Sequence, residues 1–207
     1  MVRSEIPDIV VGRLPLYLRA LTRLQNDGAD FTSSHELGQR LGISSAQIRK
    51  DLSHFGEFGK QGTGYDIASL IDALQGILHA DRVWPVALVG IGDLGHALAH
   101  YGGFTNRGFT ITQLFDKDPT KIGQRINSLV IESADVMQAS IRKARIKVAM
   151  IATPADSAQI VADALVQGGV LAILNYAPIT LTTSNGVRVQ HIDPVIHLQR
   201  MAYYINE

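Results

Sequence analysis

Three glycines with the spacing Gly-x-Gly-x-x-Gly are the residues whose type and spacing most strongly indicate chemistry in this chain. Gly90, Gly92 and Gly95 follow the apolar run Val86–Val89 directly and precede a helical stretch. In that context the first glycine permits a tight turn, the second lets a pyrophosphate approach the backbone, and the third lets helix and strand pack closely. The pattern predicts a dinucleotide-binding loop. The alternative is a glycine turn without a ligand.

A carboxylate after the next apolar strand indicates which dinucleotide binds. Asp116 closes the predicted strand Thr110–Phe115, where a carboxylate accepts both hydroxyls of the adenosine ribose and repels a 2′-phosphate. NAD(H) is therefore favoured over NADP(H). The loop residues Ile91, Asp93 and Leu94 are expected to contact the same cofactor, and Asp93 brings a negative charge close to its diphosphate.

Two more turns are predicted at the edge where a dinucleotide would bind. They follow the strands predicted for Val148–Ala152 and Val170–Leu174, and ligands of open α/β sheets bind at the carboxyl ends of strands. Both turns end at a proline, so the alternative is that they only reverse the chain. The candidate cofactor contacts at these turns are Thr153, Pro154, Asn175 and Tyr176.

A second group of polar side chains lies on an amphipathic helix predicted for Ala46–Phe55. Ile48, Leu52 and Phe55 share one face of it, which leaves the opposite face polar and basic. A helix that enters the major groove needs an apolar anchor behind and donors for phosphates and base edges in front. The alternative is a solvated helix face. The side chains expected to contact DNA are Ser45, Gln47, Arg49, Lys50, Ser53 and His54, with Lys60 from the segment that follows.

The elements around this helix have the order of a winged helix-turn-helix. An apolar stripe predicts a first helix over Leu14–Gln25, and Ser33 caps a short helix predicted for Glu36–Leu41. After the polar helix, the glycine-rich segment Gly56–Tyr65 is typical of a tight hairpin, and Ile67–Leu78 closes the region as a further helix. We therefore expect a winged-helix DNA-binding domain over residues 1–80, and this context favours DNA binding over a solvated face.

The second part of the chain has the pattern of a parallel α/β sheet. From about His79–Pro85 onward, short Val/Ile/Leu-rich runs alternate with helical stretches, which predicts a Rossmann dinucleotide-binding domain over residues 84–193. Its last strand is predicted for Val187–His191, with Asp193 at the end of the domain. Ile196–Ile205 is amphipathic and predicts a terminal helix within residues 194–207.

Composition excludes several classes of protein. The chain is 46% hydrophobic and 18% charged, values of an ordinary globular protein, and its formal net charge is zero, so DNA binding must rest on clustered cations. It has no cysteine, which excludes disulfides and thiolate metal sites, and no histidine pair has ligand spacing, so we expect no metal. The sequence has neither a transmembrane run nor the apolar centre of a signal peptide, so we expect no membrane association and a cytoplasmic protein.

Along nearly its full length the chain resembles the Rex family of redox-sensing transcriptional repressors. The stretches that carry the resemblance are Arg13–Arg19, Gln47–Ser53, Phe55–Gly59, Trp84–Gly90, Asp116–Pro119 and Ile173–Pro178. The resemblance implies a homodimer whose C-terminal helix is swapped onto the partner. It also implies that NAD⁺ permits binding to palindromic operator DNA, and that NADH closes the Rossmann domains and releases the operator.

The resemblance further implies a set of switch residues. Tyr101 and Asp193 would lie near the nicotinamide, and Arg19, on the first helix, would exchange partners with Asp193. Two residues depart from the family pattern. Asp93 stands where a neutral or basic residue is usual, and Pro194 stands where an apolar or aromatic residue is usual.

Two other functions remain open at this point. A small NAD-dependent oxidoreductase would need a substrate domain and an acid/base pair, yet a single helix follows the predicted Rossmann unit and only Tyr101 and Asp193 are formally available. A nucleotide- or CoA-binding scaffold module would not need Asp116, which offers an acceptor for a ribose diol. We therefore expect a regulator and not an enzyme.

Overall fold

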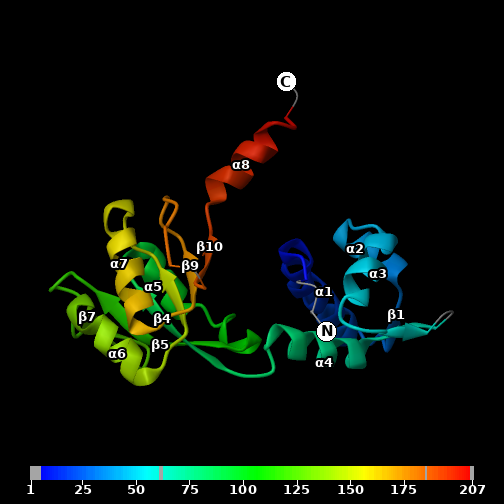
Figure 1. The fold of residues 1–207 in the computed structure, drawn as a ribbon, viewed down its shortest axis with the longest axis horizontal. Coiled ribbons are helices and arrows are strands. Elements are labelled where there is room, and N and C mark those ends of the chain that lie inside the picture. Colours follow the sequence, from blue (N-terminus) through cyan, green and yellow to red (C-terminus); the bar gives the residue numbers. More distant parts are fainter. Residues whose placement is uncertain (1–5, 61–62, 185, 206–207) are drawn as a thin grey trace. The chain divides into compact units, whose positions relative to one another are not determined.

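The computed structural model describes residues 6–60, 63–184 and 186–205, and the chain divides into two compact units, Met1–Arg82 and Val83–Glu207 (Figure 1). The elements of the first unit are α1 (Asp8–Asn26), β1 (Phe31–Thr32), α2 (Ser34–Leu41), α3 (Ser45–Ser53), β2 (Gly59–Lys60), β3 (Gly64–Asp66) and α4 (Ile67–Leu78). The order of elements is that of a winged helix-turn-helix.

Serine caps and one glycine define the helix-turn-helix. The hydroxyls of Ser33 and Ser44 accept the backbone N–H of Glu36 and Gln47, which begins α2 and α3. Gly42 ends α2 with a φ of +67°, a left-handed conformation that glycine adopts without strain. The core beneath the helices consists of Leu14, Tyr17, Leu21, Leu24, Leu37, Ile48, Leu52, Leu70 and Leu74.

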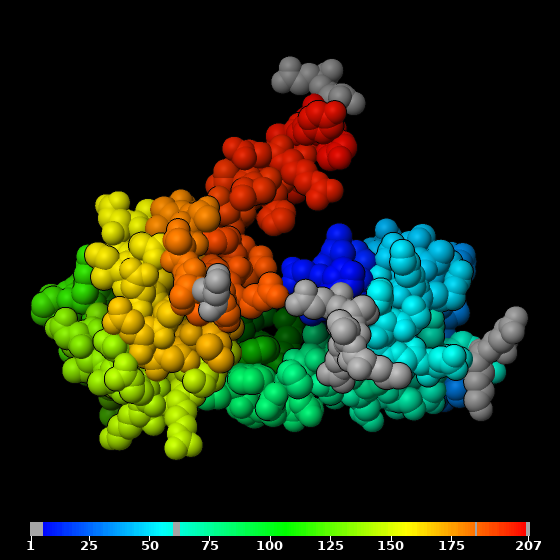
Figure 2. Space-filling view, in the orientation of Figure 1, coloured from blue at the N-terminus to red at the C-terminus, as the bar shows by residue number. Residues whose placement is uncertain are grey.

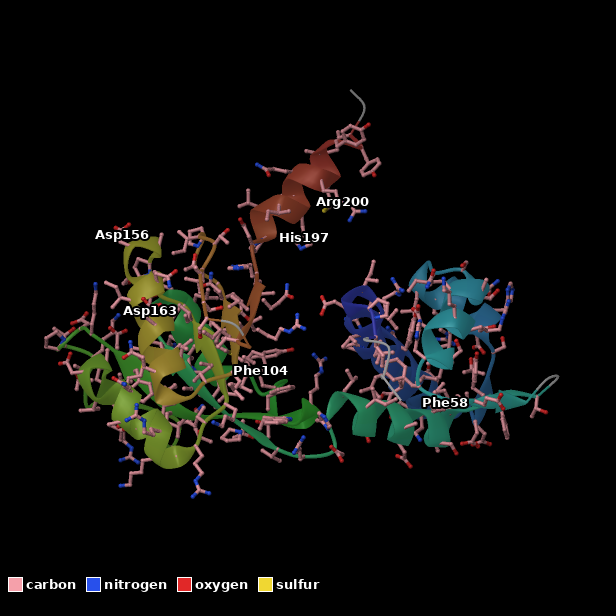
Figure 3. The ribbon with its side chains drawn as sticks, viewed as in Figure 1. Phe58, Phe104, Asp156, Asp163, His197 and Arg200 are labelled. Carbon is pink, nitrogen blue, oxygen red and sulfur yellow. The ribbon has the colours of Figure 1, made fainter. Side chains whose placement is uncertain are left out.

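Strands β2 and β3 follow the helix-turn-helix and form the wing, and β1, which precedes α2, completes a three-stranded sheet of order β1-β3-β2. Lys60 pairs antiparallel with Gly64, so the predicted hairpin is present in the described strands, although these cover only part of Gly56–Tyr65. Phe58, labelled in Figure 3, packs against the core of this unit and secures the start of the wing.

The second unit is a Rossmann fold. Its elements are β4 (Trp84–Val89), α5 (Asp93–His100), η1 (Thr105–Arg107), β5 (Phe109–Asp116), β6 (Arg125–Ile126), β7 (Leu129–Ser133), η2 (Ala134–Val136), α6 (Met137–Ala144), β8 (Val148–Ile151), α7 (Ala155–Gly168), β9 (Ala172–Asn175), β10 (Arg188–His191) and α8 (Pro194–Ala202). The seven-stranded sheet has the order β10-β9-β8-β4-β5-β7-β6, in which only β6 pairs antiparallel. The strand order reverses between β4 and β8, and such switch points are where dinucleotides bind.

Helices cover both faces of this sheet (Figure 1). Ala87 and Val89 of β4 face a core shared with α6 and α7, whereas Val86 and Leu88 face a core shared with α5. A strand whose successive residues are all buried reads as a continuous apolar run, which is why β4 was predictable.

Several predicted boundaries were wrong. The helix after the glycine loop begins at Asp93 instead of His96, so Asp93 lies in the first helical turn and not inside the loop. The fourth predicted strand begins at Ala172 instead of Val170, and neither β7 nor the edge strand β6 was predicted.

The C-terminal helix also differs from the prediction. It spans Pro194–Ala202 instead of Ile196–Ile205, with Asp193 as its N-cap. None of its described residues is buried, and the space-filling view shows its side chains open to solvent (Figure 2). Among the residues that the structure describes, no helix combines the length and the apolar character needed to cross a membrane.

Candidate functional site

A cleft of about 690 Å³ opens at the carboxyl ends of β4, β5 and β8, a volume typical of small-molecule sites. Most predicted cofactor contacts line it, namely Gly90, Gly92, Asp93, Leu94, Asp116, Thr153 and Pro154. They come from separate parts of the sequence that the strand order brings to one edge. Lys117, Lys121 and Ser157, which were not predicted as contacts, line it as well.

The three glycines of the loop serve different purposes. Gly90 has a φ of +91°, and a Cβ there would lie 2.8 Å from the carbonyl carbon and oxygen of Ala152, so the fold itself requires glycine. A Cβ at Gly92 would meet no atom within 4 Å, and Gly92 lines the cleft, so its backbone is open to a ligand. At Gly95 a Cβ would collide with the carbonyl oxygen of Gly90, so glycine at this position lets α5 lie close to β4.

The N-terminus of α5 supplies donors to the cleft. Its N-cap, Gly92, provides no side-chain hydrogen bond, so the first amides of the helix remain available to an anion. Asp93 is exposed in the first turn, where a carboxylate interacts favourably with the helix dipole. An exposed carboxylate is screened by solvent, which reduces its repulsion of a diphosphate.

Asp116 is buried at the end of β5 and is joined to the glycine loop. Its Oδ2 accepts the backbone N–H of Ile91 at 2.7 Å, and its Oδ1 accepts that of Asp118 at 2.9 Å. Lys121 Nζ lies 3.3 Å from Oδ2. Burial raises the pKa of Asp116, but these two amides and Lys121 outweigh it and the pKa is lowered. The carboxylate is therefore ionised and positions the loop, a role that the sequence pattern did not predict.

A buried hydroxyl in the cleft has no partner. Thr153 Oγ1 makes no hydrogen bond with any described residue, and Thr153 lines the cleft beside the glycine loop. Buried polar atoms are nearly always hydrogen-bonded, so this one indicates a bound group that the protein alone does not supply. With the open backbone at Gly92, the uncapped amides of α5 and the ionised Asp116, the residues present fit a dinucleotide.

The second turn is built differently from the first. The side chain of Asn175 is fully buried, its amide donates to the carbonyls of Ala177 and Ile179, and its Oδ1 accepts the N–H of Ala177. Asn175 thus shapes the turn after β9. Tyr176 is half-buried, and burial raises its pKa. Neither side chain is among the residues that line the cleft.

The predicted nicotinamide contacts also lie outside the described lining of the cleft. Tyr101 is 52% exposed and packs edge-on against Phe104, labelled in Figure 3, with 5.0 Å between ring centroids. Asp193 caps α8, because its Oδ1 accepts the N–H of Val195 at 2.9 Å. Arg19 is exposed on α1, which belongs to the other unit, so its pairing with Asp193 stays a prediction.

Part of the polar face that the sequence predicted for α3 is present. Arg49, Lys50, Ser53 and His54 are exposed, whereas Ser45 at the start of the helix is half-buried. Arg49 donates a hydrogen bond to Ser34 Oγ at 2.9 Å, and Ser53 Oγ donates one to the carbonyl of Lys50 at 2.8 Å. These two bonds restrict the side chains of Arg49 and Ser53. Gln47 is half-buried, and the side chain of Lys60 lies outside what the structure describes.

A buried charge lies on the inner face of α3. Asp51 is 0% exposed and accepts Nε and Nη2 of Arg13 at 2.6 and 2.8 Å, and the hydroxyl of Tyr17 at 2.5 Å. Burial raises the pKa of Asp51, but the hydrogen bonds, first from Arg13, outweigh it and the pKa falls to about 2. This cluster was not predicted from the sequence. The feature of the sequence that could have revealed it is an acidic residue three positions after Ile48, on the apolar stripe, where a buried charge needs a partner.

Comparison with known proteins covers both units. A family model described as "Putative DNA-binding protein N-terminus" matches residues 5–53, and one described as "CoA binding domain" matches residues 81–179. A protein of Chloroflexus aurantiacus named "Redox-sensing transcriptional repressor Rex" is 52% identical over 206 residues, covering 99% of this chain and 97% of that one. One of the same name from Streptomyces avermitilis is 44% identical, covering 96% of this chain and 79% of that one.

Solved structures agree with these relatives. The crystal structure of RSP, a Rex-family repressor, in complex with beta-NAD⁺ and operator DNA has a TM-score of 0.92 at 33% identity, covering 97% of this chain and 92% of that one. RSP in complex with beta-NADH has a TM-score of 0.89 at 31% identity, covering 97% and 94%.

Proposed function

The chain belongs to the Rex family of redox-sensing transcriptional repressors, and we propose that it binds operator DNA when NAD⁺ occupies the cleft and releases it when NADH does. The observation that supports this most is the presence of two sites in one chain, a dinucleotide cleft in one unit and a helix-turn-helix in the other. RSP was crystallised with both ligands of such a switch, beta-NAD⁺ with operator DNA and beta-NADH.

In the cleft, different residues would bind different parts of NAD(H). The amides of Gly92 and of the first turn of α5 would hold the pyrophosphate, and the ionised carboxylate of Asp116 would accept the adenosine ribose hydroxyls. Thr153 would donate or accept at its unpartnered hydroxyl. We assign cofactor contacts also to Ile91, Asp93, Leu94, Gly90, Gly95, Pro154, Asn175, Tyr176 and Tyr101.

Redox sensing requires a contact that depends on the charge of the nicotinamide ring, which the cofactor carries when oxidised and lacks when reduced. A ligand shifts a two-state equilibrium only by its differential affinity for the two states. Asp193, at the N-cap of α8, would sense that charge and exchange its interaction with the ring for one with Arg19 of α1. Asp193 would thus read the redox state, and Arg19 would transmit it to the DNA-binding unit.

We infer that the chain acts as a homodimer in the bacterial cytoplasm, where a chromosomal operator is found. The C-terminal segment exposes large apolar side chains that a monomer would leave in water, namely Val195, Ile196, Leu198, Met201, Tyr203, Tyr204 and Ile205. Swapping α8 onto a second copy would bury them and give the two-fold symmetry that a palindromic operator needs.

The other candidate functions are supported less well. The curated relatives are named repressors and not oxidoreductases. The match to a CoA binding domain model supports a nucleotide site in general. Asp116 distinguishes the two ligands, because it offers an acceptor for a free ribose diol, whereas CoA carries a phosphate on its ribose. Competition between NADH and CoA for the cleft therefore separates these two functions.

The experiment begins with selection of a binding site from a pool of random DNA duplexes in the presence of NAD⁺. NADH is then added at fixed NAD⁺, and release of the selected duplex is followed for the parent protein and for Asp193→Asn. We expect the parent to release DNA and Asp193→Asn to bind it but release it less, because the charge that senses the ring is lost. Superimposable release curves would show that Asp193 does not carry the redox signal. Failure of the parent to release DNA would refute the proposed switch.

A further inference from the structure

Gln47 is placed where a recognition helix reads bases. It lies in the first turn of α3, and helix-turn-helix proteins contact base edges with the N-terminal residues of this helix. Its Nε2 donates to Asp51 Oδ1 at 2.7 Å. Because an ionised carboxylate only accepts hydrogen bonds, the amide must turn its nitrogen toward Asp51. The orientation of the Gln47 amide is therefore defined before DNA binds.

The carboxylate that orients Gln47 is itself held from a different helix. Oδ1 of Asp51 receives Arg13 Nη2 and Gln47 Nε2, and Oδ2 receives Arg13 Nε and Tyr17 OH. Four donors occupy the roughly four acceptor positions of a carboxylate. Arg13 and Tyr17 both belong to α1, so the amide is fixed relative to the helix packed behind α3 and not only to its own backbone.

The outward atoms of this amide define what it can read. With one N–H donated to Asp51, Gln47 retains its Oε1 as an acceptor and a second N–H as a donor. In the major groove adenine presents an N6 donor beside an N7 acceptor, which complements that pair. Guanine presents two acceptors and cytosine a lone donor, so neither complements both atoms.

We propose that Asp51, held by Arg13 and Tyr17, fixes the amide of Gln47 as a reader of adenine in the major groove. The proposal rests on the proposed DNA binding by α3. Gln47 is the contact to the base, and Asp51 is a positioning residue that never touches DNA. The charged cluster beneath α3 thereby contributes to sequence specificity as well as to packing.

The test is selection from a random duplex pool with the parent, Gln47→Ala and Gln47→Glu. We expect the parent to enrich adenine at one position of each half-site. Gln47→Ala should lose the preference there by roughly 5- to 150-fold, the discrimination of one bidentate pair, and leave the other positions unchanged. Gln47→Glu, which only accepts hydrogen bonds, should shift the preference at the same position to cytosine. Gln25→Ala, the same change at an exposed site on α1, is the control and should select like the parent.

A further variant tests the positioning role. Asp51→Asn should relax the preference at that one position, a change that a merely structural residue would not confine to a single base pair. NADH affinity, measured by fluorescence, and thermal unfolding check that the variant is folded. If Asp51→Asn does not fold, Tyr17→Phe provides the second variant, because it removes one of the side chains that hold Asp51 and should relax the adenine preference in part.

Two results would count against the inference in different ways. A parent protein that enriches no sequence refutes the proposed function, and this inference with it. A parent that enriches a site which Gln47→Ala and Gln47→Glu read unchanged overturns this inference alone. An adenine preference that is unchanged in a folded Asp51→Asn, or in Tyr17→Phe where Asp51→Asn does not fold, would show that the cluster beneath α3 does not orient Gln47.

Discussion

Replacing either of the first two glycines of the loop by alanine should separate their contributions to fold and to cofactor binding. At Gly90 the φ of +91° and a Cβ only 2.8 Å from the Ala152 carbonyl oppose the change. A left-handed L-residue costs about 1–2 kcal/mol and an overpacked site about 1–3 kcal/mol, so Gly90→Ala should lose about 2–5 kcal/mol of stability. At Gly92 φ is −81° and the Cβ meets no atom within 4 Å, so Gly92→Ala should be about as stable as the parent.

Both variants should bind NADH more weakly, for different reasons. The Cβ of Gly92→Ala would stand where the pyrophosphate approaches the backbone, and one lost hydrogen bond to a charged group costs about 1.5–3 kcal/mol, or roughly tenfold or more in affinity. Fluorescence titration with NADH and urea unfolding measure the two effects. Gly76→Ala on α4, with open space around its Cβ, is the matched control and should change neither the affinity nor the cleft. Parent-like NADH binding by Gly92→Ala, or parent-like stability of Gly90→Ala, would refute this reasoning.

Three other predictions follow from the same structure. Lys50→Ala and Arg49→Ala should weaken binding to a selected operator, lowering the salt slope by about one for each lost phosphate contact, and leave NADH affinity unchanged; equal operator binding at matched salt would exclude α3 as the recognition helix. Asp116→Asn should weaken NADH binding by roughly tenfold or more and reduce the ratio of the affinities for NADH and NADPH, which paired titrations measure. A parent protein that binds NADH and NADPH equally well would contradict the role of Asp116. Because the pKa of Asp51 is lowered from 3.8 to about 2, its ionisation stabilises the fold above pH 4. The free energy of unfolding should therefore fall by about 2 kcal/mol as the pH falls from about 4 to below 2. In urea unfolding, Asp51→Asn should show a smaller loss of stability over that range.

The sequence predicted those parts of the fold that rest on local patterns. Val86–Val89 is buried on both faces and reads as a continuous apolar run, and Ser33 caps its helix through a hydroxyl whose spacing from Glu36 is visible in the chain. The strand β7 was missed because it is only partly buried and its apolar residues, Leu129–Ile131, form too short a run. Asp93 was placed in the loop because nothing local shows that the helix begins directly after Gly92.

The candidate site was predictable where a motif carried it and not where distant residues meet. The glycine loop and Asp116 are a motif, but the bond from Ile91 to Asp116 joins two segments that only the sheet brings together. The same holds for the cluster beneath α3. Arg13 and Asp51 are far apart in the sequence, and only the packing of α1 against α3 reveals that the charge of Asp51 is paired.

In the proposed switch, operator DNA and NADH oppose one another on this chain, and the most direct test is the affinity for NADH with and without saturating operator DNA. Coupling between two sites is reciprocal, so bound operator must weaken NADH binding by the same factor by which NADH weakens operator binding. We predict a factor of roughly 5 to 150, the usual range for such coupling. An NADH affinity that is the same with and without operator would contradict the proposed switch.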